Sequence, residues 1–130
     1  MNRFHLHIGV ADLDASVRFY ENLFGEPPTL RRHDYAKWLL DDPAVNIALS
    51  SGERGIRMGV DHVGLQTDSP AILAALAGRL SKGDAPTAAE PNVTCCYARS
   101  EKTWTEDPDG LRWETFMTHE EGVDESDRCN

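Results

Sequence analysis

Polar and apolar residues alternate from Arg3 to Val10, which is the pattern of a half-buried strand. The apolar side chains take the even positions, so His5 and His7 share the opposite face. A helix is predicted next, with Asp12 as its N-cap and Gly25 at its C-terminal end. Between them, apolar residues recur at steps of four, three and four, as one face of a helix requires. These residues are Leu13, Val17, Tyr20 and Phe24.

The same plan returns in the second half of the chain. A strand is predicted from His62 to Thr67, and a helix follows, with Ser69 as its N-cap and Gly83 at its end. Each predicted helix is followed by three short extended runs. In the first half they cover residues 29–32, 35–40 and 45–50, and in the second half residues 86–90, 102–105 and 111–118. Each half therefore reads as one strand, one helix and three strands.

This internal repeat predicts an α+β fold built from two βαβββ modules. Neither copy can bury its sheet alone, so we expect the two to pack together and form a metal-binding cleft. A single domain is expected over residues 1–118, with module one over about 1–52 and module two over about 60–118. Residues 119–130 are expected to form an acidic, flexible tail. Both a monomer and a homodimer fit this plan, because two modules can form the cleft within one chain or between two chains.

The repeat also places His5 and His62 at equivalent positions. Glu114 lies in the last predicted strand, and two imidazoles with one carboxylate form a triad typical of non-haem Fe(II) and other divalent metals. A lone strand histidine or glutamate is more often a solvated group, but chance rarely gives two histidines in matching positions. We therefore predict a metal site of His5, His62 and Glu114. For His7, a role beside the metal or toward the substrate and a plain solvated histidine fit equally well.

A pair of adjacent cysteines, Cys95 and Cys96, follows Pro91 and Asn92. In a strand, the two side chains would face opposite ways, and a buried cysteine often acts only as a small apolar residue. In a loop, where Pro91 and Asn92 place the pair, both sulfur atoms can reach one soft ion. The sequence therefore favours a second site for a thiophilic substrate.

Composition and charge exclude several classes of partner. The formal net charge of −9 argues against nucleic acids and anionic membrane surfaces, which bind basic patches. The apolar runs are too short to span a membrane, and the first residues do not have the pattern of a signal peptide. Three cysteines do not make a disulfide framework, so we expect a cytoplasmic protein with reduced thiols.

At these residues the sequence resembles the vicinal oxygen chelate superfamily, which includes glyoxalase I, extradiol dioxygenases and fosfomycin-resistance proteins. Within it, the chain is similar to the organoarsenical carbon–arsenic lyases and cadmium-induced proteins. The resemblance extends over about residues 3–118, and its most specific part is the cysteine pair that precedes a lysine and a tryptophan. The matching runs are Phe19-Tyr20, Leu23-Phe24-Gly25, Tyr35-Ala36-Lys37, Thr94-Cys95-Cys96-Tyr97-Ala98, Glu101-Lys102-Thr103-Trp104, Asp107-Pro108-Asp109-Gly110 and Trp113-Glu114.

The resemblance implies Fe(II)- and dioxygen-dependent cleavage of the carbon–arsenic bond in trivalent organoarsenicals. It implies metal ligands at His5, His62 and Glu114, and an arsenic site at Cys95 and Cys96. Lys102 and Trp104 are expected to shape or close the cleft, although a solvated lysine and a core tryptophan are the simpler interpretations. Members of this branch commonly carry a longer cysteine-containing tail, whereas this sequence has one cysteine near its end, Cys129, which we expect to be dispensable.

Two other functions are compatible with the same residues. A protein that binds cadmium or arsenite without turnover would use the cysteine pair alone. Another glyoxalase- or dioxygenase-type metalloenzyme is also possible, but glyoxalase I takes a further protein ligand from the last strand of the first half. The corresponding run, residues 45–49, offers no carboxylate.

Overall fold

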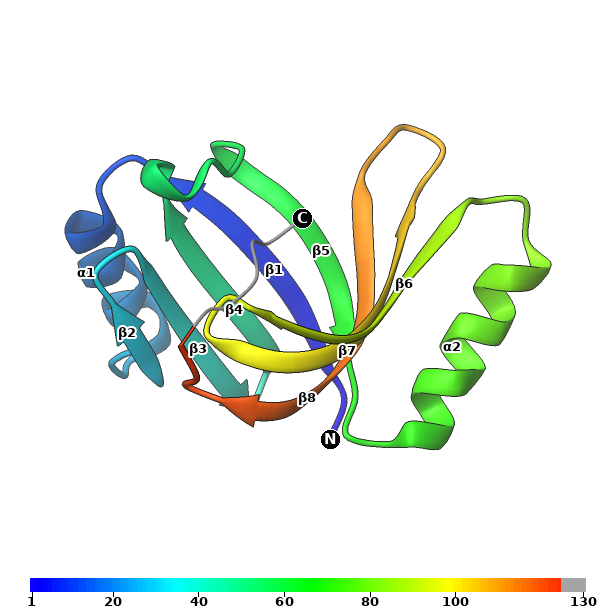
Figure 1. Cartoon of the computed structure of the whole chain (residues 1–130). Coiled ribbons are helices and arrows are strands. Elements are labelled where there is room, and N and C mark those ends of the chain that lie inside the picture. Colours follow the sequence, from blue (N-terminus) through cyan, green and yellow to red (C-terminus); the bar gives the residue numbers. More distant parts are fainter. Residues whose placement is uncertain (125–130) are drawn as a thin grey trace. The chain divides into compact units, whose positions relative to one another are not determined.

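The computed structural model describes residues 1–124, and its elements follow the predicted order of two βαβββ modules (Figure 1). The first module comprises β1 (Arg3–Val10), α1 (Leu13–Phe24), β2 (Leu30–Arg32), β3 (Tyr35–Asp41) and β4 (Ala44–Ser51). After a short 3-10 helix, η1 (Gly52–Arg54), the second comprises β5 (Gly59–Gln66), α2 (Pro70–Lys82), β6 (Thr87–Cys95), β7 (Ala98–Glu106) and β8 (Arg112–Glu121). The predicted α+β fold class is confirmed.

The chain divides into two compact units, which are described one at a time. The N-terminal unit is Phe4–Val63, and the C-terminal unit begins at Gly64 and includes Met1–Arg3. The predicted tail begins within β8, which runs to Glu121, three residues beyond the predicted strand. Residues 125–130 of that tail, with Cys129, lie outside the described residues.

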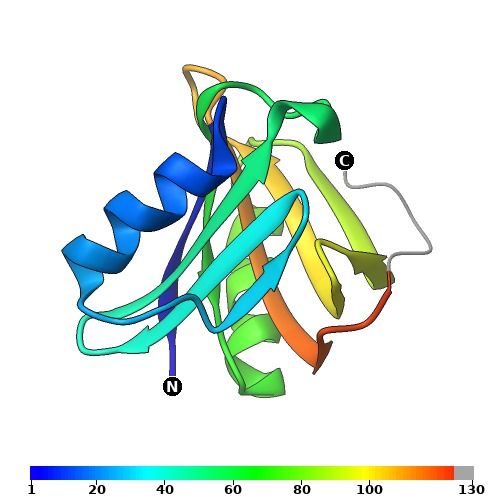
Figure 2. The ribbon, with the colours of Figure 1, turned by 90° about the vertical axis from the view of Figure 1, so that its left-hand side faces the viewer.

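In the N-terminal unit, the strands follow the order β2-β3-β4-β1-β5. β1 pairs in parallel with β4, and β3 pairs in antiparallel with β2 and β4. Helix α1 lies on one side of these strands (Figure 2). The apolar core forms there from Leu13, Val17, Ala36, Trp38, Leu40 and Leu49, with Ile8 and Val10 packed against it. The even positions of β1 thus face the helix, as their alternation predicted, and the odd positions face away.

Both helices begin and end where the sequence indicates. The Asp12 carboxylate accepts a hydrogen bond from the Ala15 amide at 3.0 Å, and the Ser69 hydroxyl accepts one from the Ile72 amide at 3.2 Å. Gly25 adopts the left-handed conformation (φ 77°), and its amide bonds the Glu21 carbonyl. Gly83 ends α2 in an extended conformation instead (φ −83°).

In the C-terminal unit, the strands β8, β7 and β6 form an antiparallel meander, and α2 lies against β8. The loop predicted around Pro91 is wrong, because β6 continues through this residue to Cys95. β6 is an edge strand, and its pairing with β7 shifts between Glu90 and Val93. A proline, which has no N–H to donate, is tolerated at such a bulge on an edge strand. Within the described residues, neither helix is long and apolar enough to cross a membrane.

Candidate functional site

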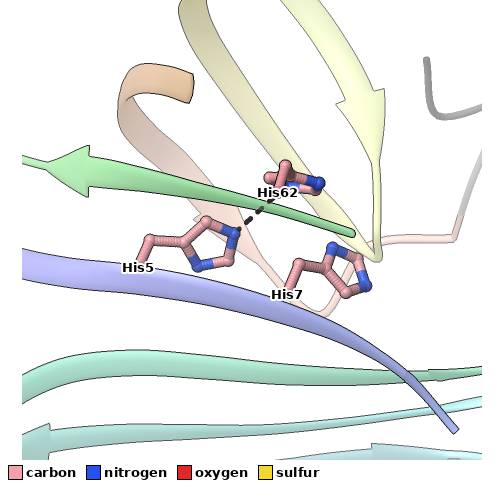
Figure 3. Close-up of side chains that lie close together, drawn as sticks. All are labelled: His5, His7 and His62. Carbon is pink, nitrogen blue, oxygen red and sulfur yellow. Dashed lines mark hydrogen bonds between the residues drawn. The ribbon is translucent and has the colours of Figure 1, made fainter. Parts of the chain in front are cut away.

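The face of the N-terminal unit opposite the apolar core carries three buried histidines. His5 and His7 take odd positions of β1, and His62 comes from the neighbouring strand β5. Their side chains gather at one place between the two strands (Figure 3). The residues are 5%, 3% and 5% exposed. The structure therefore brings together the two histidines that the repeat predicted as a pair, and adds the third.

The three imidazole rings lie close enough together to bind one metal ion. The Nε2 atoms of His5 and His62 are 3.4 Å apart, and the centroid of the His7 ring lies 4.8 Å from that of His62. One nitrogen from each ring lies within 4.8 Å of the others. Nitrogen ligands lie about 2.1 Å from a zinc-like ion, so two of them at a near-tetrahedral angle are about 3.4 Å apart. The spacing of His5 and His62 fits one divalent ion.

The other nitrogen of His5 and of His62 is fixed by an acceptor. His5 Nδ1 donates to the Asn46 carbonyl at 3.0 Å, and His62 Nδ1 donates to the Asp61 carboxylate at 2.7 Å. Both acceptors require the proton on Nδ1, so the neutral rings direct their Nε2 lone pairs at each other. A hydrogen bond between these atoms needs an extra proton, whereas one cation satisfies both lone pairs. The donor set therefore fits a metal ion.

Glu114 belongs to the C-terminal unit, where it pairs with Lys102. The Lys102 ammonium lies 3.0 Å from Glu114 Oε2, and both residues are buried. Burial alone would lower the pKa of Lys102, but the Glu114 carboxylate raises it above its usual value, together with Cys96 and Glu90. The interpretation of Lys102 as a solvated lysine is therefore wrong.

Trp104 is held beside this pair by polar and cationic neighbours. Its indole N–H donates to Glu90 Oε1 at 2.5 Å, and the Arg112 guanidinium stacks over its ring at 4.3 Å. Trp104 is half-buried and hydrogen-bonded, so it is not a plain core tryptophan. Lys102 and Trp104 lie two apart on β7, and Trp104 pairs with Glu114 on β8, which puts all three side chains on one face.

Gly64 lets the Glu114 strand approach closely, a feature that the sequence analysis missed. A Cβ atom at Gly64 would lie 2.4 Å from the Glu114 carbonyl oxygen and 2.9 Å from its Cγ. No side chain fits at these distances. The available signal was a glycine inside a predicted strand, which often marks a close backbone approach.

The two cysteines lie where β6 turns into β7. Cys95 is the last residue of β6, and the turn to β7 consists of Cys96 and Tyr97, which both adopt the left-handed conformation (φ 55° and 58°). This turn brings the Sγ atoms of Cys95 and Cys96 to 3.4 Å, so the pair can reach one atom even though Cys95 is in a strand. Cys95 is disulfide-bonded in this structure, so it must be reduced before it can bind an ion.

The sequence matches known proteins over most of its length. A family model described as the Glyoxalase/Bleomycin resistance protein/Dioxygenase superfamily matches residues 3–115. A trivalent organoarsenical cleaving enzyme of Bacillus sp. (strain MD1) is 39% identical over 115 residues, which are 88% of this chain and 71% of that protein. The cadmium-induced protein CadI of Mycobacterium bovis is 33% identical over 89% of this chain and 76% of its own length.

Solved structures with similar folds include a glyoxalase and a dioxygenase. The Mn(II)-bound glyoxalase of Novosphingobium aromaticivorans aligns with a TM-score of 0.64 at 22% identity, over 100% of this chain and 44% of that one. Homoprotocatechuate 2,3-dioxygenase of Arthrobacter globiformis aligns with a TM-score of 0.65 at 21% identity, over 92% of this chain and 36% of the dioxygenase chain. At these identities the likeness concerns the fold alone, and it agrees with the predicted βαβββ modules.

Proposed function

Because the chain belongs to the glyoxalase/bleomycin resistance protein/dioxygenase superfamily, we propose that it is an enzyme that cleaves the carbon–arsenic bond of trivalent organoarsenicals, with Fe(II) as the metal and dioxygen as the oxidant. The observation that carries the proposal is the approach of His5 Nε2 and His62 Nε2 to 3.4 Å, while the Nδ1 atom of each ring is hydrogen-bonded to an acceptor. The names of relatives at 33–39% identity supply the substrate class.

The proposed metal ligands are His5, His62 and Glu114. The two histidines are held with Nε2 as the ligand atom, and the Lys102 ammonium favours the ionised form of Glu114, which is the form that binds a metal. Two nitrogens and one carboxylate leave coordination positions for other molecules, and bound Fe(II) would supply the electrons that activate dioxygen. This chain's residues would bind and orient the ion, and each of the three is buried in its own unit.

The proposed arsenic site is the reduced pair Cys95 and Cys96. Thiolates prefer soft, thiophilic centres, and two sulfur atoms 3.4 Å apart can bind one arsenic atom. The Lys102 ammonium belongs to the same unit, and Cys96 is one of the groups that raise the pKa of Lys102. Lys102 and Trp104 shape the protein around the bound arsenical. Fixing the arsenic atom presents its organic group for oxidation without a diffusional search.

The test is the release of inorganic arsenite from a trivalent methyl or phenyl arsenical. Reduced, Fe(II)-loaded protein is assayed in air and under anaerobic conditions, and metal-free protein serves as the control. We expect release only with both Fe(II) and dioxygen. Equal release without dioxygen would contradict the oxidative reaction.

A second candidate function is the binding of cadmium or arsenite without turnover. The relatives named cadmium-induced protein and the approach of the two cysteine sulfur atoms favour it. A binding protein of this kind needs only the thiols and is indifferent to dioxygen. In the same assay it would bind the arsenical tightly and release no arsenite under either condition.

A further inference from the structure

We propose that His7 is a third histidine ligand, so that His5, His7 and His62 bind one divalent ion together. This inference rests on the metal site of the proposed function and adds a ligand to it. Residues two apart in a strand lie about 6.6 Å apart along it and share a face. The His5 and His7 ring centroids are 6.0 Å apart, and the His62 ring lies 5.3 Å from the first and 4.8 Å from the second. The three rings thus enclose one small space (Figure 3).

The environment of His7 resembles that of the other two rings. His7 Nε2 bonds the Ser50 hydroxyl at 2.7 Å, and Ser50 is fully buried in β4. We assign Nδ1 as the ligand atom of His7, because the Ser50 hydroxyl then accepts the proton of Nε2. Each of the three rings has one nitrogen held by a neighbour, which is the usual arrangement of metal-binding histidines. The Tyr35 ring packs edge-on against the His7 ring, with 6.0 Å between the ring centroids.

The distances between the ring nitrogens predict how His7 joins in binding the ion. One nitrogen from each ring lies within 4.8 Å of the others, and two ligands about 2.1 Å from an ion can be at most about 4.2 Å apart. A small rotation of the His7 ring therefore accompanies binding. Three imidazoles suit borderline ions such as Fe(II), Co(II), Ni(II) and Zn(II), and a three-histidine set also occurs in carbonic anhydrase. Because all three lie in the N-terminal unit, this part of the site does not depend on Glu114.

The first test counts the ligands in the natural protein. Co(II) is added to the full chain, and the exchangeable imidazole N–H protons shifted by the paramagnetic ion are counted by NMR in water. We expect three such signals. Two signals at full Co(II) occupancy would overturn the inference and would leave His5 and His62 as ligands.

The second test measures Co(II) affinity by equilibrium dialysis, without any activity. We expect the His7→Ala variant to bind at least about 10-fold more weakly and to lose one shifted signal, as His62→Ala should. His33→Ala, which removes an exposed histidine, is the matched control and should leave affinity unchanged. Unchanged affinity and spectrum in His7→Ala would make His7 a structural partner of Ser50. Arsenite release is measured separately, so the inference can fail while the cleavage reaction holds, and the reverse.

Discussion

The N-terminal and C-terminal units hold their buried polar groups in different ways. In the first, the histidines are held by a backbone carbonyl, a carboxylate and a hydroxyl, and the Nε2 lone pairs of His5 and His62 face each other. In the second, the Glu114 carboxylate already has a cation beside it, the ammonium of Lys102. The histidine cluster can therefore hold an added ion, whereas an ion at Glu114 would have to share that carboxylate with Lys102.

The largest expected effect separates the proposed arsenic site from the proposed metal site. Replacing Cys95 or Cys96 by serine removes one of two sulfur atoms, so arsenite release should be abolished, a fall of about 10⁴-fold or more, because chelation by two groups is lost. The affinity for Co(II) should be unchanged, since neither cysteine is among the proposed metal ligands. Both quantities are measured on reduced protein. Cys129→Ser is the control and should keep full activity. A Cys129→Ser variant as inactive as the other two would place the tail in the site.

The next effect concerns the buried pair of Lys102 and Glu114. Lys102→Met leaves a buried carboxylate without its ammonium, which should lower the free energy of unfolding by about 3–5 kcal/mol. Urea denaturation of the metal-free protein measures it. The double variant Lys102→Met with Glu114→Gln removes both charges and should recover most of the loss. A loss of less than about 1 kcal/mol in the single variant would show that Lys102 does not compensate Glu114.

The sequence predicted the elements well because their signals are local. Both modules were located by the alternation in β1, by the caps at Asp12 and Ser69, and by the repeat. The repeat also predicted that His5 and His62 lie together.

The turn at Cys96 was missed because Pro91 suggested an earlier break, and only the edge position of β6 shows why the strand continues. The role of His7 was left open because it depends on Ser50, 43 positions away in β4. The pairing of Lys102 with Glu114 depends on the register of β7 and β8. Such partners are set by tertiary structure, which local patterns do not encode.

The smallest expected effect is at Asp61, which contacts the proposed metal ligand His62. Its Oδ2 accepts the proton of His62 Nδ1, and its Oδ1 accepts the Arg57 amide at 3.1 Å. Asp61→Asn keeps the shape of the side chain but removes its charge, which makes His62 a weaker ligand. Co(II) affinity should fall by about 10-fold, the lower end of the range for partners of metal-binding histidines. Arsenical binding should not change. The cysteine variants should show the opposite pattern, with the arsenic chemistry lost and Co(II) affinity kept. A fall in arsenical binding with Co(II) affinity intact would mean that Asp61 acts on the substrate, and its proposed role as the partner of the metal ligand His62 would then be wrong.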